Sequence, residues 1–101
     1  MMNLHDWLSV QHPGLRTYKA FQQKTFELSK TDAEHKALYK LLSSIVSPYI
    51  DAFDEEPLPN AIAETTFSRL LEVVRDAENS VLLPLPEQVR VLNSIASVDL
   101  V

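Results

Sequence analysis

Residues 38–53 read LYKLLSSIVSPYIDAF and contain the clearest periodicity in the chain. Their apolar side chains recur at intervals of three and four residues, which places them on one face of an α-helix. These positions are Leu38, Leu41, Leu42, Ile45, Val46, Tyr49, Ile50 and Phe53. The stripe continues in phase through Pro48, although an interior proline removes one backbone hydrogen bond and bends a helix. We therefore expect one long helix over residues 32–54, kinked at Pro48.

The residues before this helix predict how it begins. Thr31 and Glu34 have the spacing of a capping box, in which each side chain binds the backbone N–H of the other residue. Further upstream, apolar stripes predict helices over residues 3–11 and 15–28, separated by a turn at residues 12–14 where proline and glycine follow histidine. We expect Val10 and Phe26 to face inward on these two helices.

The second half of the chain contains two further helical patterns. One covers residues 61–78, with Asn60 as its N-cap and Asn79 as a left-handed C-cap. The other covers residues 86–97. Their expected inward positions are Ile62, Thr66, Phe67, Leu70, Leu71, Val74 and Ala77 in the first, and Val89, Leu92, Ile95 and Ala96 in the second. The apolar, proline-punctuated residues 81–86 between them are expected to lie across the core.

These patterns together predict an all-α fold, a four- to five-helix bundle with a long, Pro-kinked third helix. We expect residues 1–101 to form a single helical domain, because no linker long enough to divide the chain interrupts the pattern. The expected core lies between the third and fourth helices and consists of Leu38, Leu41, Leu42, Ile45, Ile50, Phe53, Phe67, Leu70, Leu71 and Val74.

Residue counts exclude several classes of function. The single glycine, Gly14, rules out the phosphate-binding and nucleophile-elbow motifs that need several glycines at fixed offsets. The chain has no cysteine, which excludes disulfides, thiolate zinc sites and cysteine nucleophiles. We also expect no membrane span and no signal peptide, and so a soluble protein of the cytoplasm.

The net charge of −5 is divided unevenly between the two halves of the chain. Residues 1–50 carry six Lys or Arg and four Asp or Glu, a sum of +2; residues 51–101 carry three and ten, a sum of −7. Two interpretations remain open: opposite faces of one bundle attract each other, or two copies assemble through them. In the second, Arg16, Lys19 and Lys24 of one copy, with Lys30, Lys36 and Lys40, face Asp51, Asp54, Glu55 and Glu56 of another.

The residue patterns indicate metal-binding or catalytic chemistry only weakly. Asp51 and Asp54 have the i, i+3 spacing of a carboxylate pair in helical magnesium-dependent phosphohydrolases, but Arg75 occupies the position that a second pair requires. His5, His12 and His35 match no compact metal-ligand pattern. No serine has a histidine and an acid beside it in sequence, and only the three-dimensional structure can test such a triad. We therefore predict neither a catalytic residue nor a metal or cofactor.

Excess apolar surface is the remaining feature, and it favours a protein partner. The candidate surface consists of Trp7, Val81, Leu82, Leu83, Leu85 and Leu100, which alternatively cap the open ends of the bundle. We expect a non-catalytic interaction module, an adaptor or regulatory subunit that binds a protein partner and associates with itself as a homo-oligomer, such as a homodimer. The alternatives are a small magnesium-dependent phosphohydrolase and a nucleic-acid-binding regulator. The nucleic-acid-binding regulator is disfavoured by the acidic net charge of the chain and by the expected core positions of the aromatic residues near the lysines.

Overall fold

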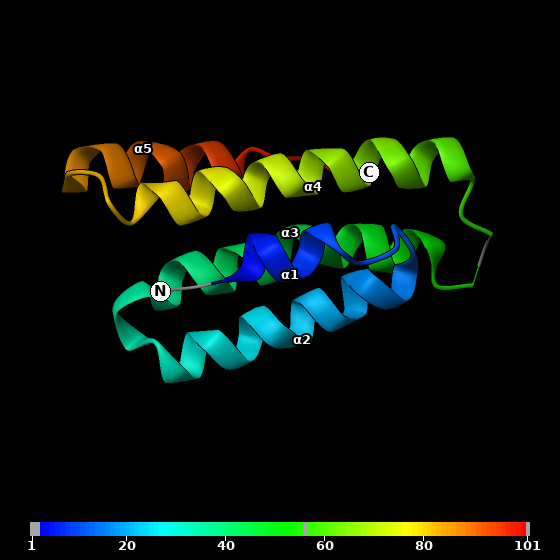
Figure 1. The fold of residues 1–101 in the computed structure, drawn as a ribbon, viewed down its shortest axis with the longest axis horizontal. Helices are drawn as coiled ribbons and strands as arrows, with labels where there is room; N and C mark the ends of the chain where they lie inside the picture. Colours follow the sequence, from blue (N-terminus) through cyan, green and yellow to red (C-terminus); the bar gives the residue numbers. More distant parts are fainter. Residues whose placement is uncertain (1–2, 56, 101) are drawn as a thin grey trace.

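The periodic segment around Ile45 forms α3 (Lys36–Phe53), a central helix of the bundle (Figure 1). The computed structural model describes residues 3–55 and 57–100, and within these ranges the regular structure is entirely helical. The other elements are α1 (Leu4–Ser9), α2 (Leu15–Thr31), the 3₁₀ turn η1 (Ala33–His35), α4 (Asn60–Ser80) and α5 (Leu85–Ala96). The predicted all-α bundle is confirmed, and it measures 41 × 23 × 22 Å.

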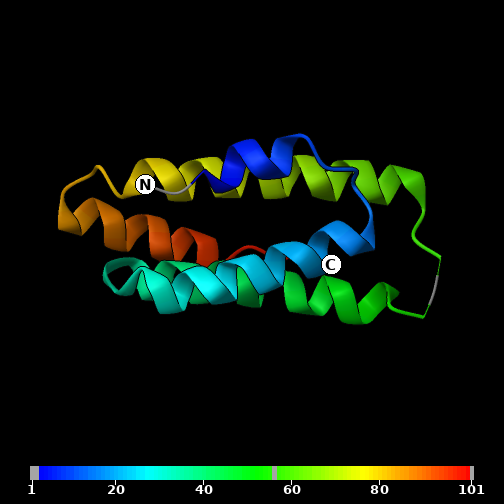
Figure 2. The ribbon, with the colours of Figure 1, turned by 60° about the horizontal axis from the view of Figure 1, so that its bottom comes forward.

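The helices are arranged as two antiparallel hairpins, and α3 pairs most closely with α2 and not, as predicted, with α4. α2 packs against α3 to form one hairpin, and α4 and α5 form the other, in which α5 also contacts α3 (Figures 1 and 2). The short α1 lies along the outside of α4 (Figure 2). Its start is held there because the backbone N–H of His5 donates to Oε1 of Glu78 on α4 at 2.7 Å. A carboxylate at this end of a helix satisfies a free N–H and opposes the helix dipole.

The core follows the predicted stripe of α3. Leu42, Val46 and Tyr49 have no exposed surface, and the Tyr49 ring lies 4.5 Å from that of Tyr18 on α2. Burial raises the pKa of the Tyr18 hydroxyl. Ten core residues were predicted: Leu38, Leu42, Ile45, Ile50, Phe67, Leu70 and Val74 are buried, and Leu41, Phe53 and Leu71 are half-buried against the core.

The third helix is continuous through Pro48, as predicted. Proline cannot donate the hydrogen bond that the carbonyl of Ser44 would otherwise accept. One turn earlier, the side-chain amide of Gln22 on α2 donates to the Ser43 carbonyl at 3.2 Å and to the Ser47 hydroxyl at 2.5 Å. The neighbouring hairpin helix therefore supports α3 beside the turn that the proline weakens.

Several predicted boundaries in the first half are wrong. α1 ends at Ser9 and leaves Val10 exposed, because the Thr17 hydroxyl donates to the His12 carbonyl at 2.6 Å and ties the turn to the start of α2. α2 runs on to Thr31, whose hydroxyl donates to the Glu27 carbonyl of its own helix. The capping box with Glu34 is therefore not formed, and α3 begins four residues later than predicted, after η1. Phe26 is also exposed.

The second half differs from prediction in how its helices are rotated and where they end. Asn60 is the first residue of α4 and not its cap, and Asn79 lies within the helix, which ends at Ser80. Ile62 is exposed, because α4 turns the side that carries Ala63 and Thr66 toward the bundle, where both are buried. On α5, Val91, Leu92 and Ile95 pack against the core, which leaves Val89 and Ala96 exposed. Residues 81–84 form a short corner and do not lie across the core.

Replacing Pro48 with alanine should stabilise the fold, because alanine supplies the missing N–H inside a helix. We expect the free energy of unfolding to rise by about 1–3 kcal/mol, the interior-proline penalty less the entropy that proline removes from the unfolded chain. Urea unfolding followed by circular dichroism measures the change. Pro86→Ala is the matched control, since Pro86 lies in the first turn of α5 where no intrahelical N–H is needed. Equal effects of the two substitutions would contradict the explanation.

Candidate interaction surface

The corner between α4 and α5 is a tight, hydrogen-bonded turn. The backbone N–H groups of Leu82 and Leu83 donate to the carbonyls of Asn79 and Ser80 at 3.2 and 3.0 Å, which continues the last turn of α4. The side-chain amide of Gln88 donates to the Leu83 carbonyl at 2.8 Å and joins the corner to the first turns of α5. These bonds hold the corner in one conformation, so its side chains are presented on an ordered backbone.

Four large apolar side chains are exposed at this corner. Leu82 is 79% exposed, Leu85 74%, Val89 54% and Leu83 40%. We refer to these four residues as the corner patch. Exposed apolar side chains that occur singly are ordinary in proteins, and only larger groups of them mark an interaction surface. These four lie close together in sequence, at the corner and in the first two turns of α5.

The corner patch coincides only in part with the surface predicted from sequence. Leu82, Leu83 and Leu85 belong to it, and sequence reasoning missed Val89 because it placed that residue in the core. The other three predicted residues lie elsewhere: Leu100 is buried, Val81 packs against the core, and Trp7 is half-buried on α1. The Nζ atom of Lys24 lies 5.3 Å from the centre of the Trp7 ring, in a cation–π contact.

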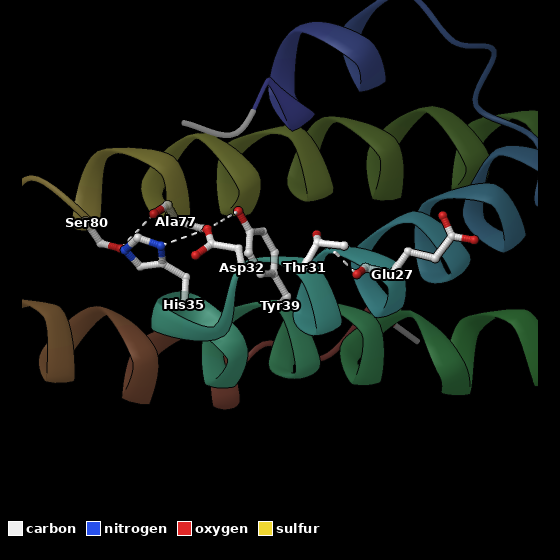
Figure 3. Close-up of polar contacts among 7 residues, drawn as sticks. All are labelled: Glu27, Thr31, Asp32, His35, Tyr39, Ala77 and Ser80. Carbon is white, nitrogen blue, oxygen red and sulfur yellow. Dashed lines mark hydrogen bonds and ion pairs between the residues drawn. The ribbon is translucent and has the colours of Figure 1, made fainter.

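A polar cluster lies at the α2–α3 connection, beside the end of α4 (Figure 3). Oδ2 of Asp32 lies 2.9 Å from Nδ1 of His35 and accepts a hydrogen bond from the Tyr39 hydroxyl at 3.3 Å. The His35 ring extends from Asp32 toward Ser80 (Figure 3). His35 and Ser80 line a small cavity of about 70 Å³ together with Glu34, Ala37, Leu38, Val81, Gln88 and Leu92.

The protonation equilibria of the cluster follow from these contacts. The hydrogen bond with His35 lowers the pKa of the Asp32 carboxyl, and burial raises the pKa of Tyr39 to about 12, with the charge of Asp32 adding to that shift. Asp32 is therefore ionised and Tyr39 neutral at neutral pH. The carboxylate joins η1 to α3 at the connection on which His35 lies.

The cluster contains an aspartate, a histidine and a serine, so its geometry must be compared with that of a catalytic triad. The Ser80 hydroxyl is buried and donates its hydrogen to the Ala77 carbonyl, 2.6 Å away on the same helix. In a triad that hydrogen passes to the histidine, which acts as the base. The cavity is also smaller than the roughly 300–1,000 Å³ of pockets that hold organic ligands. In this arrangement the cluster joins Asp32 and His35 of the α2–α3 connection to Tyr39 of α3.

The predicted charge-complementary residues meet within one chain at a single described ion pair. Nζ of Lys19 lies 2.6 Å from Oδ1 of Asp54, and both side chains are about half exposed. Asp51 and Glu55 are exposed beside this pair, and Arg16 and Lys24 lie exposed on α2. Glu56 lies outside the described residues. The Lys19–Asp54 contact supports attraction between faces of one bundle, although an exposed pair of this kind contributes less than about 1 kcal/mol.

The residues weighed for metal binding do not come together. Within residues 3–55 and 57–100, no three His, Asp or Glu side chains gather at a geometry suited to a metal ion. Asp51 and Asp54 border a shallow surface pocket with Ala52 and Glu55. His12 is exposed, and His5 lies in the first turn of α1. In the same part of the chain, no helix combines the length and apolarity needed to span a bilayer.

Comparison with known proteins leaves the surface to be interpreted from its own chemistry. The chain matches no protein-family model, no curated protein and no solved structure.

Replacing Asp32 with asparagine should destabilise the fold at neutral pH, because the charge that His35 and Tyr39 stabilise is lost. A folded-state pKa below the ordinary 3.8 stabilises the native state above that value, and the contribution is lost as the pH falls through the folded pKa. The difference in melting temperature between wild type and Asp32→Asn should therefore shrink on acidification. Glu34→Gln removes an acid from the same turn and serves as the control. A difference that persists unchanged in acid would contradict this account.

Proposed function

We propose that this protein is a non-catalytic interaction module, of the adaptor or regulatory-subunit kind, that binds a protein partner through the corner patch. The observation that carries the proposal is the grouping of Leu82, Leu83, Leu85 and Val89 at one exposed corner. Two exposed prolines, Pro84 and Pro86, lie among them and restrict the backbone.

The order of the corner supports this function. Its backbone hydrogen bonds are formed within the chain, and the Gln88 side chain, which shares a small cavity with His35, donates to the Leu83 carbonyl. A preorganised surface loses little conformational entropy when a partner binds, which favours affinity. Leucine, valine and proline side chains offer a partner apolar area without a charge that must be desolvated.

The alternative functions have weaker support. A magnesium-dependent phosphohydrolase would use Asp51 and Asp54, but Lys19 already binds the Asp54 carboxylate. A nucleic-acid-binding regulator would use the lysines with nearby aromatic rings, but Tyr18 and Phe21 are buried. Phe26 is exposed, and Lys30 lies over its ring at 4.4 Å.

Site-specific photocrosslinking tests the proposal. A photoreactive amino acid at position 82 should crosslink to a protein in a lysate of the source cells, and an excess of unlabelled wild-type chain should compete with that product. The matched control is position 10, since Val10 is equally exposed, at 79%, and lies at the end of α1 away from the corner.

The competitor also has a matched variant. Leu85→Ser with Val89→Ser removes two of the four exposed apolar side chains of the patch and should weaken competition. Equal crosslinking from positions 82 and 10, or undiminished competition by the double variant, would overturn the proposal.

A further inference from the structure

The two ring nitrogens of His35 face different parts of the bundle. Nδ1 lies 2.9 Å from Oδ2 of Asp32, at the α2–α3 connection. The other nitrogen, Nε2, lies on the far side of the ring and points toward Ser80 at the end of α4 (Figure 3). His35 and Ser80 line the same cavity of about 70 Å³. The ring therefore lies between the first hairpin and the end of the first helix of the second.

The contact with Asp32 determines which nitrogen carries the hydrogen of a neutral His35 ring. The hydrogen bond with His35 holds the pKa of the Asp32 carboxyl below its ordinary value of 3.8, so this group is an ionised acceptor at neutral pH. The Tyr39 hydroxyl donates to the same oxygen at 3.3 Å, as it would to a carboxylate. Nδ1 must then be the N–H of the neutral ring, and Nε2 carries only a lone pair.

The other side of the cavity offers Nε2 no donor from Ser80. The hydroxyl of Ser80 gives its hydrogen to the Ala77 carbonyl at 2.6 Å, so its oxygen presents lone pairs. Glu34 also lines the cavity, and its carboxylate can only accept. A neutral His35 thus directs a lone pair at acceptors. A protonated ring has an N–H on both nitrogens and can donate to Asp32 and to Ser80 at the same time.

We infer that protonation of His35 completes a hydrogen-bonded link from Asp32 through the imidazole ring to Ser80, so that the junction of the two hairpins tightens in mild acid. Histidine changes charge between about pH 8 and 5. The His35 side chain is 27% exposed, which lets it exchange protons with solvent. Asp32 stays ionised over this range, because its pKa lies below 3.8.

The link ends at the residue that supports the corner. The backbone N–H of Leu83 donates to the Ser80 carbonyl at 3.0 Å, and Val81 lines the cavity beside His35. A firmer Ser80 therefore makes the corner more ordered. This effect is independent of the proposed function, because it concerns the backbone of the corner whether or not a partner is bound.

The charges around the cavity favour a cation at its centre. The titratable and charged groups come from each element that packs there: Asp32 and Glu34 at the connection, Lys36 and Tyr39 on α3, Glu78 on α4, and Glu87 and Arg90 on α5. Tyr39 is neutral, and Glu87 and Arg90 pair with each other at 3.2 Å. Three acids remain against Lys36, which is exposed.

Urea unfolding of wild type and Ser80→Ala at pH 8 and at pH 5.5 tests the inference. Ser80→Ala removes the acceptor, and the link contributes stability at low pH that is lost as the pH rises and His35 releases its proton. The ratio of the two unfolding constants should be at least about threefold larger at pH 5.5, since a hydrogen bond to a charged group exceeds a neutral one. The lost Ser80–Ala77 bond contains no titrating group and affects both pH values equally.

Two histidine variants show which residue titrates. His35→Gln retains a side-chain donor for Asp32 but takes up no proton, so in this background the effect of Ser80→Ala should be the same at both pH values. His12→Gln is the matched control, because His12 is exposed in the turn before α2, and it should leave the pH dependence intact. Circular dichroism shows that each variant is folded.

Hydrogen exchange at the Leu83 amide gives a second readout. Its protection, corrected for the intrinsic effect of pH on exchange, should rise about threefold or more from pH 8 to 5.5 in wild type and stay constant in His35→Gln. Three results would overturn the inference: an effect of Ser80→Ala that does not change with pH, a pH dependence that persists in His35→Gln, or a Leu83 protection that does not rise in wild type.

Discussion

Burial of the apolar stripe of α3 is the constraint on which the rest of the structure depends. One face of this helix is covered by α2 and another by α5, and Leu42, Val46 and Tyr49 are left without contact with water. A bundle of 101 residues has little interior, so covering this stripe consumes most of the apolar side chains that the other helices can offer. α5 contributes through Val91, Leu92 and Ile95. Its remaining apolar residues, Leu85 and Val89, then have no place inside.

The corner patch follows from this geometry and from the shortness of the α4–α5 connection. Only residues 81–84 separate the two helices, so the connection turns within its own hydrogen bonds and cannot fold back over the core. His35 of the polar cluster lines a small cavity with Val81 and Gln88, which lie next to patch residues in the chain. The hydrogen bonds of the cluster join η1 to α3, and the exposed leucines of the corner are the part of the surface on which the proposed function rests.

The sequence predicted the elements that depend on long, regular patterns. The bundle class, the continuous helix through Pro48 and seven of the ten core residues come from the 3.6-residue period of residues 38–53 and 61–78, which local sequence carries in full. Short local motifs were less reliable. Thr31 and Glu34 have the capping-box spacing, yet the Thr31 hydroxyl binds the Glu27 carbonyl because α2 extends past the expected boundary.

Only part of the corner patch could be predicted from the sequence. Residues 81–85 form an apolar run, and leaving such a run in water costs free energy unless the core or a partner covers it. The sequence therefore indicated that Leu82, Leu83 and Leu85 belong either to the core or to a contact surface. Tertiary structure decided between the core and the surface, because the rotation of α5 against α3 and α4 buries Ile95 and exposes Val89. It also brought His35 to Ser80, 45 positions apart in the chain. Such pairings depend on how helices pack, and no local pattern encodes them.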